Sequence, residues 1–301
     1  MARKRIALAL HGGAGPLSKY IIENEEAYRE HLLQYAERGY ELLGEGCTAV
    51  DVVRTVISLL EDDPLFNAGR GSALNFQGRV EMDACLMDGR TGDSGAVCSI
   101  TEARNPILVA SLVMERTGHM LISGSGADDL ARQFGAVVEA PDFFLVRERL
   151  REWQEFRASQ VDPWSVPNRG TVGAVALDAH GDLASGTSTG GITGRLKGRV
   201  GDSCIIGAGC YAQNGACAVS GTGDGEFLMR EFTALSIFQA YCKDQGNVQQ
   251  HCQTAVHRHR ARQADMGVIC IDQGGEIGIS YNSERMFRAW ADGRGITAGI
   301  Y

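Results

Sequence analysis

The sequence predicts an α+β fold in which helices cover layered sheets, and two observations carry this prediction. Helical patterns come before and after blocks of consecutive strands, which favours a layered α+β sandwich over a doubly wound parallel sheet. The 39 glycines among 301 residues are about twice the usual share. They gather at the ends of short apolar runs, which indicates tight turns at strand ends. A chain of this length with 44% hydrophobic residues can bury a large core.

The first half of the chain predicts both strands and helices. An apolar run at 5–10 is typical of a strand, and it leads into the glycine-rich turn "HGGAG" at 11–15. Apolar residues recur with helical spacing over 23–43, and Thr48 is a suitable N-cap for a second helix over 49–61. We then expect strands near 79–87 and 94–100, a helix over 106–116, and a short helix after "SGSGADD".

Residues 139–170 differ from the rest and are typical of a linker or a mobile arm. Prolines flank a charged amphipathic helix, "LVRERLREWQEFRAS", whose interleaved arginines and glutamates indicate a solvated face. Beyond this segment, strands are expected at 171–178, 183–188, 205–209 and 216–221. Two helices, at about 225–242 and 247–262, come next, and strands at 267–272 and 277–281 follow them.

Charge and composition argue against several classes of partner and location. A net charge of −8 and a pI near 5.4 disfavour binding to nucleic acids or anionic membranes, which need a basic surface. The longest apolar run is well short of the about 18 residues of a membrane helix. The run after the basic N-terminus is too short for a signal peptide, so we expect a cytoplasmic protein. The nine cysteines lack C-x-x-C or zinc-type spacing, and we interpret most of them as reduced core residues.

Two hydrolase interpretations compete for the glycine-rich stretches. In the first, "GTSTG" at 186–190 is the G-x-S-x-G motif of an α/β-hydrolase with Ser188 as nucleophile. "HGGAG" would then supply the oxyanion loop, and His251, His257 or His259 would complete the site. However, "GITGRLKGRVG", the stretch that follows, contains four glycines and lacks the helix that such a nucleophile needs. We therefore favour the second interpretation.

The second interpretation makes Thr171 the nucleophile, within "NRGTVGAVALD" at 168–178. A threonine hydroxyl needs a base beside it, and a free α-amino group, with a pKa near 8, can serve without a partner residue. Cleavage between Gly170 and Thr171 would create that amine. Gly170 tolerates a strained backbone before the cut, and β-branching restricts the rotamers of Thr171. The Gly-Thr pair alone also suits an ordinary strand start, so the surrounding motifs decide.

Motifs along nearly the whole chain resemble those of the N-terminal-nucleophile (Ntn) hydrolases of the plant-type asparaginase and isoaspartyl peptidase family. The motifs are "HGGAG" at 11–15, "DPLFNAGRGSALN" at 63–75, "EMDACLMDG" at 81–89, "RNPILVASLVME" at 104–115, "GTVGAVALD" at 170–178, "TSTGGI" at 187–192, "GRVGDS" at 198–203, "GAGCYA" at 207–212, "SGTGDGE" at 220–226 and "AGIY" at 298–301. The resemblance implies one Ntn-hydrolase domain, residues 1–301, folded as a four-layer αββα sandwich. It also implies self-cleavage into an α chain, 1–170, and a β chain, 171–301.

The same resemblance implies how the nucleophile is assisted. Thr171 attacks the substrate as the new N-terminus, and Thr189 contacts and tunes its hydroxyl. Thr222 and the N–H of Gly223 form an oxyanion hole, whose donors are typically worth about 3 kcal/mol each. Supporting contacts are expected from the first half of the chain, namely from Asn67, Gly12 and Gly13.

Substrate and cation binding are also implied by the resemblance. Arg199 and Asp202 hold the α-carboxylate and the α-ammonium group of the substrate, in agreement with the chemistry of these side chains. No cofactor is implied for catalysis. Residues 60–70 match a loop that wraps a structural sodium or potassium ion with backbone carbonyls, here those of Leu60, Glu61, Asp63, Phe66, Ala68 and Arg70. We interpret the carboxylates of Asp62 and Asp63 as exposed helix-end acids and not as metal ligands.

The implied reaction is hydrolysis of L-asparagine to aspartate and ammonia, and of isoaspartyl (β-aspartyl) dipeptides, by a dimer of αβ units. A glycosylasparaginase-like hydrolase is the alternative within the family, although such enzymes typically carry Asn at the position of Gly190. A non-catalytic amino-acid-binding protein is the alternative outside catalysis. The chain departs from the family pattern at Gly194-Arg195, Cys204 and Asp224, which leaves the preference between substrates open.

Overall fold

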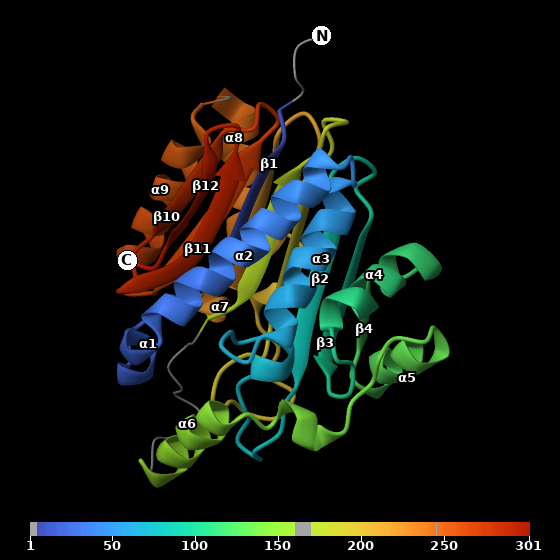
Figure 1. Cartoon of the computed structure of the whole chain (residues 1–301), viewed down its shortest axis with the longest axis vertical. Coiled ribbons are helices and arrows are strands. Elements are labelled where there is room, and N and C mark those ends of the chain that lie inside the picture. The colour runs from blue at the N-terminus through green and yellow to red at the C-terminus, as the bar shows by residue number, and fades with distance from the viewer. Residues whose placement is uncertain (1–4, 160–169, 245) are drawn as a thin grey trace.

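The structure, a computed structural model, describes residues 5–159, 170–244 and 246–301. Its elements form four layers, with two sheets face to face and helices on both outer sides (Figure 1). In this view α2 (Glu25–Gly44) and α3 (Ala49–Asp62) cross in front of the large sheet. At the left, α8 (Thr233–Asp244) and α9 (Val248–Arg260) cover the small sheet. The predicted αββα sandwich is confirmed.

The large sheet places the start of β5 (Val172–Leu177) at its centre, between β1 (Ala7–Gly15) and β6 (Leu183–Thr189). Val172 pairs with Ser188 across β5 and β6. Eight strands in the order β12-β11-β1-β5-β6-β2-β3-β4 make up this sheet, the others being β2 (Met82–Asp88), β3 (Ser94–Ile100), β4 (Leu121–Ser123), β11 (Arg285–Asp292) and β12 (Gly295–Gly299). Thr171 therefore precedes a strand that is hydrogen-bonded on both sides.

The small sheet brings a second set of strand ends to the same place. Its order is β10-β9-β8-β7, formed by β7 (Cys210–Ala212), β8 (Cys217–Gly223), β9 (Met266–Asp272) and β10 (Ile277–Tyr281). Because β8 packs across β5 and β6, its last residues reach the beginning of β5.

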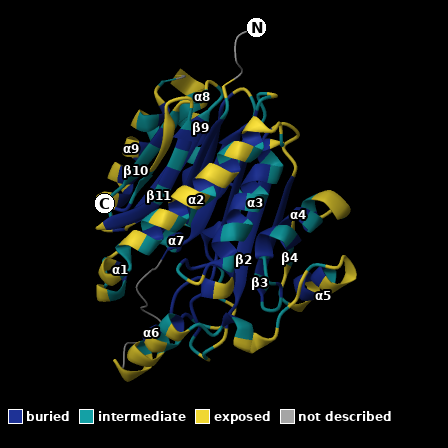
Figure 2. Cartoon of the chain, in the orientation of Figure 1, coloured by how far each residue is buried: buried dark blue, intermediate teal, exposed yellow. Residues whose placement is uncertain are grey.

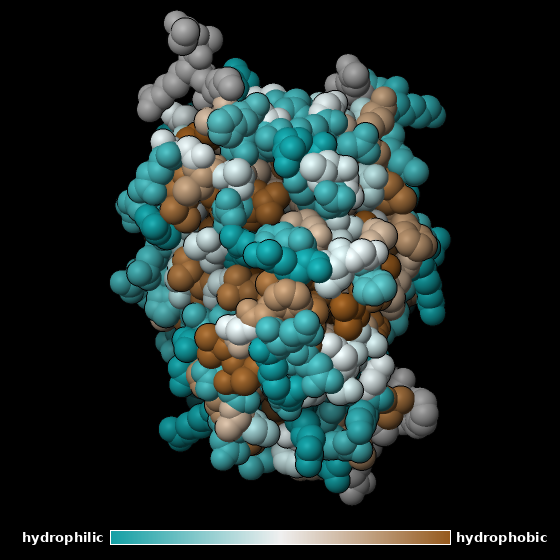
Figure 3. Space-filling view, turned by 90° about the vertical axis from the view of Figure 1, so that its right-hand side faces the viewer, coloured by the Kyte–Doolittle hydropathy of each residue, from teal (hydrophilic) through white to brown (hydrophobic). Residues whose placement is uncertain are grey.

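Apolar side chains fill the three spaces between the four layers. Figure 2 shows buried strands inside and exposed residues on the outer faces of the helices. The face in Figure 3 is mostly hydrophilic, with hydrophobic residues in small groups between polar ones. The nine cysteines are free thiols and most are buried, as predicted. Among the described residues, no helix combines the length and the apolar character that crossing a bilayer needs.

Helix α6 (Arg147–Ala158) has the predicted solvated face, on which Arg147, Arg151 and Arg157 are exposed, but its other face is packed against the protein. Arg149 and Glu152 are buried and paired at 3.0 Å, and Arg149 also donates to the carbonyl oxygens of Leu65 and Gly71 at 3.1 and 2.7 Å. The interpretation as a mobile arm is therefore wrong for this helix, because Arg149 binds the backbone of a distant loop. The last part of the predicted linker, 160–169, lies outside the described residues.

Several other boundaries also differ from the predictions. The strand predicted at 205–209 is a turn, and β7 begins only at Cys210. The helix predicted at 225–242 divides into α7 (Gly225–Glu231) and α8, because Phe232 adopts a left-handed conformation with φ of 45°. Strands β4, β11 and β12 were not predicted. In β11, Arg285 and Arg288 interrupt the apolar pattern, and their partners, the carbonyl oxygens of Pro16 and Tyr301 among them, come from distant segments.

Candidate active site

Thr171 lies at the head of β5 with its side chain almost completely buried. Its N–H donates to Oγ1 of Thr222 at 3.0 Å, and its carbonyl oxygen accepts from Nδ1 of His11 at 2.9 Å. Its Oγ1 lies 3.3 Å from Oγ of Ser203. The nitrogen, the carbonyl and the hydroxyl of the predicted nucleophile each contact a different side chain, so the whole residue is held in one orientation.

The bond before Thr171 is held as well. Gly170 has a φ of +24°, and its carbonyl oxygen accepts from Nδ2 of Asn67 at 2.7 Å. A Cβ added at Gly13 would lie 2.7 Å from Cα of Gly170, so the backbones approach as closely as glycine allows. Asn67 and Gly13 are thus placed at the predicted cleavage site. Gly12 instead faces the Phe66 ring, 2.3 Å from an added Cβ, and its place is in the packing behind the site.

Thr189 lies beside Thr171 without bonding its hydroxyl. The pairing of Val172 with Ser188 places the two threonines next to each other on adjacent strands. However, Oγ1 of Thr189 accepts from the N–H of Gly191 at 3.0 Å. The hydroxyl that contacts Thr171 is that of Ser203, a residue of the "GRVGDS" motif that was not singled out from the sequence.

Thr222 and Gly223 end β8 at the same point. Oγ1 of Thr222 accepts both from Thr171 and, at 3.4 Å, from the N–H of Ala14. Its own hydrogen can therefore point to a third group. Gly223 has a φ of +136°, and an added Cβ would lie 2.3 Å from the carbonyl oxygen of Asp265. Only glycine fits there without a shift of the neighbouring backbone.

Arg199 and Asp202 converge over Gly225. A Cβ added at Gly225 would lie 3.0 Å from Nη2 of Arg199 and 2.8 Å from Oδ1 of Asp202. Burial raises the pKa of Asp202 to about 7, and the charge of Arg199 offsets only part of that shift. Its Oδ2 is buried and has no hydrogen-bond partner among the described residues. Glu226, which was not predicted, accepts from Nε and Nη2 of Arg199 at 2.9 and 2.8 Å and orients the guanidinium.

His11 is a second residue that was not singled out from the sequence, although it begins the "HGGAG" motif. It is completely buried, and burial lowers its pKa to about 3. The ring is therefore neutral near pH 7. Because a carbonyl oxygen only accepts, Nδ1 carries the hydrogen and donates to Thr171, while Nε2 lies 2.9 Å from Oγ of Ser220. His11 thus orients the backbone of Thr171 and does not contact the hydroxyl.

In the loop over 60–70, the carboxylates of Asp62 and Asp63 make internal contacts. Asp62 accepts from Arg104 at 2.8 Å. Asp63 is buried and accepts from His31 and Tyr35 at 2.7 and 3.0 Å, so its interpretation as an exposed acid is wrong. Both carboxylates thus have side-chain donors as partners. Among the described residues, no group of three or more His, Cys, Asp or Glu is arranged to hold a metal ion.

The backbone of the same loop is wound tightly. Added Cβ atoms at Gly69 and Gly71 would lie 2.3 and 2.0 Å from the carbonyl oxygens of Glu61 and Phe66. These oxygens belong to two of the six residues predicted to hold a cation. Uncharged carbonyl oxygens on such a loop fit a hard cation held by backbone alone.

The α/β-hydrolase interpretation fails on the position of Ser188. This residue is completely buried within β6 and donates to Oε1 of Glu61 at 2.6 Å. Ser188 lies inside the strand, and β6 is followed by turns where the motif needs a helix. The histidines lie on α9, on the outside of the small sheet. His259 is buried and bonded to Thr233 at 3.0 Å.

Comparisons with known proteins agree with this arrangement. A family model described as asparaginase matches residues 4–300 of the chain. The isoaspartyl peptidase of Escherichia coli is 41% identical over 311 residues, which cover 99% of this chain and 96% of that protein. The isoaspartyl peptidase of Salmonella typhimurium is 40% identical, over 99% of both chains. The isoaspartyl peptidase/L-asparaginase of Xenopus laevis is 39% identical, over 98% of this chain and 94% of that protein.

Proposed function

The chain belongs to the asparaginase family, and on that premise we propose that it hydrolyses L-asparagine to aspartate and ammonia and cleaves isoaspartyl dipeptides. The names of its relatives support both substrates. The observation that carries the proposal is the position of Asp202. Its unpartnered, buried Oδ2 belongs to the residue just before Ser203, whose hydroxyl touches that of Thr171. A site for an ammonium group thus adjoins the nucleophile.

Substrate binding divides between two charged side chains. The α-ammonium group pairs with Asp202, which supplies the missing partner for its buried oxygen. The α-carboxylate pairs with Arg199, whose Nε and Nη2 are already held by Glu226. The remaining Nη1 then donates to the substrate. These two contacts direct the side-chain amide, or the isoaspartyl bond, toward Thr171.

Thr171 first cleaves its own chain. Its Oγ1 attacks the carbonyl carbon of Gly170, the C–O bond forms, and the C–N bond to Thr171 breaks. Asn67 donates to the oxygen of that carbonyl and stabilises the charge that develops on it. The departing nitrogen takes up a proton and becomes the α-amino group, and water then hydrolyses the ester. The products are chains 1–170 and 171–301.

The mature nucleophile follows the same course with the substrate. The neutral α-amine accepts the hydroxyl proton while Oγ1 attacks the side-chain carbonyl carbon. The hydroxyl of Thr222 and the N–H of Gly223 stabilise the oxyanion. The amine or ammonia leaves with the proton, and water hydrolyses the acyl-enzyme to release aspartate. Thr189 supports this step from the adjacent strand.

A structural cation and an oligomer are part of the proposal. A sodium or potassium ion held by the backbone carbonyls of the loop over 60–70 would stiffen the segment that presents Asn67. The tight winding of this loop at Gly69 and Gly71 supports it. The family resemblance supports a dimer of αβ units, which the mass of the native protein in solution would test.

The glycosylasparaginase-like alternative conflicts with the packing at Gly190. An added Cβ there would lie 2.4 Å from Cβ of Ser72 and 2.6 Å from the backbone nitrogen of Ala73. An asparagine at this position would need a shift of that backbone. This observation favours the proposed pair of substrates.

Intact-mass spectrometry on wild type and Thr171→Ala tests the proposal. The 32.3 kDa chain should yield fragments of about 18 and 14 kDa, the smaller beginning at Thr171. The variant should stay uncut and hydrolyse neither L-asparagine nor β-aspartyl-leucine. A cleaved protein that binds aspartate without turnover would support a binding protein instead. Full activity in an uncut chain would exclude Thr171 as an N-terminal nucleophile.

A further inference from the structure

Strand β2 holds the loop that carries Arg199 through two acidic residues. Glu81, just before the strand, accepts from the N–H of Gly198 at 3.1 Å. Asp83 accepts from the N–H of Gly201 at 3.5 Å and from that of Ser99 at 2.8 Å. The β2–β3 register shifts between Met82 and Ala84, so Asp83 lies at a bulge. The backbone on both sides of Arg199 is thus attached to the start of β2, an inner strand of the large sheet.

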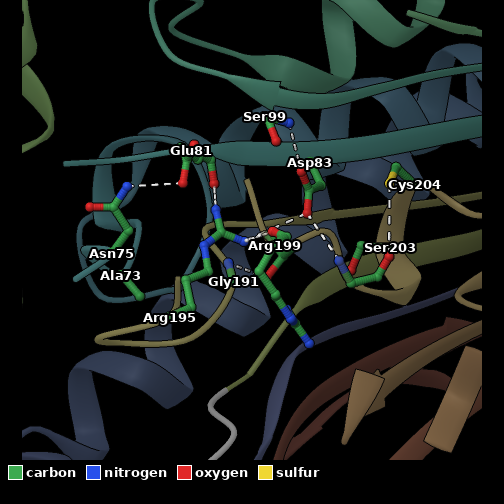
Figure 4. A network of polar contacts seen from close by, with 12 residues as sticks. Ala73, Asn75, Glu81, Asp83, Ser99, Gly191, Arg195, Arg199, Ser203 and Cys204 are labelled. Carbon is green, nitrogen blue, oxygen red and sulfur yellow. Dashed lines mark hydrogen bonds and ion pairs between the residues drawn. The ribbon is translucent and has the colours of Figure 1, made fainter. Parts of the chain in front are cut away.

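The buried side chain of Arg195 contacts both the start of β2 and the loop that carries Arg199 (Figure 4). It is 1% exposed and forms an ion pair with Asp83 at 3.7 Å. Its Nη2 donates to the carbonyl oxygen of Glu81, and its Nη1 donates to the carbonyl oxygen of Arg199 at 3.2 Å. One guanidinium therefore reaches both the start of β2 and the backbone of the proposed substrate-binding arginine.

The same guanidinium also touches the turn beside the nucleophile. A Cβ added at Gly191 would lie 2.0 Å from Nη1 of Arg195. The N–H of Gly191 donates to Thr189, and its carbonyl oxygen accepts from Asn67 at 2.7 Å. These contacts place Arg195 between the turn next to Thr171 and the loop that holds the charged end of the substrate.

We propose that Arg195 is a positioning residue for substrate recognition. It fixes the backbone of residues 198–201, and through it the side chains of Arg199 and Asp202, in the geometry that binds the α-carboxylate and α-ammonium groups. This inference rests on the proposed function. The buried guanidinium is suited to the task because its donors lie in one rigid plane and reach several acceptors at once. Its hydrogen bonds and its ion pair reach the start of β2 and the loop that carries Arg199, whereas self-cleavage depends on Thr171 and the groups bonded to it.

Arg195→Met is the main variant, with Arg195→Lys as the conservative variant. Arg195→Met should self-cleave as the wild type does. Its KM for β-aspartyl-leucine should rise about tenfold or more, while kcat stays within about threefold of the wild-type value. The reason is that a change which weakens the binding of the substrate and of the transition state equally raises KM and leaves kcat unchanged. Arg195→Lys keeps the charge opposite Asp83 and should recover most of the KM. Arg54→Met is the matched control, because Arg54 has three side-chain partners far from the loop, and its KM should be unchanged.

A second variant and a second readout keep the inference testable if Arg195→Met fails to fold. Asp83→Asn/Arg195→Met leaves neither charge unpaired and should fold and show the same rise in KM. Independently of activity, hydrogen exchange at the amides of Gly198 and Gly201 should accelerate in the Arg195 variants. A wild-type protein without activity would refute the proposed function, but hydrogen exchange would still test whether Arg195 holds the loop. Unchanged KM and exchange in an active Arg195→Met, or a fall in kcat alone, would overturn the positioning role.

Discussion

The backbone nitrogen of Thr171 lies 3.0 Å from the hydroxyl oxygen of Thr222, although 51 positions separate the two residues. In the proposed mechanism this nitrogen belongs to the bond that breaks, and after cleavage it is the free amine that serves as base. One hydroxyl would then be adjacent to the leaving nitrogen of the first reaction and to the base of the second. We therefore expect self-cleavage and turnover to depend on the same contact.

Replacing Thr222 should slow both reactions. Thr222→Val keeps the shape of the side chain but removes the oxygen that contacts Thr171 and the donor to the oxyanion. We expect kcat to fall about 100- to 1000-fold, the usual effect of losing one such donor, and self-cleavage to slow in parallel. Steady-state kinetics and the time course of intact mass measure the two effects. Thr233→Val is the control, because it removes a buried hydroxyl that is bonded to His259 on the far side of the small sheet. Wild-type kcat in Thr222→Val would contradict this role.

A methyl group at Gly13 should prevent self-cleavage. The added Cβ would lie 2.7 Å from Cα of Gly170, so the peptide bond would be pushed away from the hydroxyl of Thr171. Gly13→Ala should therefore accumulate as the full-length chain on a denaturing gel. Gly46→Ala is the matched control, since Gly46 also has a positive φ, +91°, and no neighbouring atom within 4 Å of an added Cβ. It should lose about 1 kcal/mol of stability and still cleave. Equal cleavage in both variants would refute the steric argument.

Substrate capture should weaken as the pH falls below about 7. Burial raises the pKa of Asp202 to about 7, and the protonated carboxyl cannot pair with an ammonium group. The value of kcat/KM should therefore rise with pH through this range, because it reports ionisations of the free enzyme. Asp202→Asn should lose about 100-fold in kcat/KM. Its plot of kcat/KM against pH should keep only the ionisation of the α-amine of Thr171. If the variant shows the same two ionisations as the wild type, neither belongs to Asp202.

Glu61 should make the protein less stable as the pH rises. Burial raises its pKa to about 8, above the 4.5 of an unfolded chain. The folded state then binds a proton that the unfolded state releases, so this stabilisation is complete below pH 4.5 and disappears as the pH rises through 8. Between pH 5 and 8 the free energy of unfolding of Glu61→Gln, relative to wild type, should increase by up to about 1.4 kcal/mol per pH unit. Denaturant titrations at several pH values measure this difference. Parallel curves for the two proteins would show that Glu61 is ionised throughout.

Motifs in the sequence predicted most of the proposed site, because they report residues whose chemistry is specific. The structure brings Thr222 and Asn67 to the bond between Gly170 and Thr171, and it places Arg199 next to Asp202. The positions missed act through partners that are far apart along the chain. Ser203 is 32 positions from Thr171, and His11 is 160 positions away. The residues next to Ser203 and His11 in the sequence do not predict such contacts.

In the fold too, local sequence patterns predicted some elements, and others depend on contacts between distant parts of the chain. Strand β5 was predicted because its apolar run is buried on both faces. Strand β11 was not, because its arginines find backbone carbonyls only once the sheet has formed. Helix α6 has the composition of a solvated helix, yet Arg149 and Glu152 are buried by the loop they contact.

The sequence by itself determined the class of fold and the family, and it led to Thr171 as the proposed nucleophile and to Arg199 and Asp202 as the proposed contacts of the substrate, since periodicity and motif chemistry are local properties of a chain. Only the tertiary structure decided which groups touch them. It placed Ser203 against the hydroxyl of Thr171, Glu226 on Arg199, and a buried Arg195 behind the recognition loop. The physical reason is that burial and long-range hydrogen bonds depend on what packs across the sheets, and neither spacing nor composition encodes those neighbours.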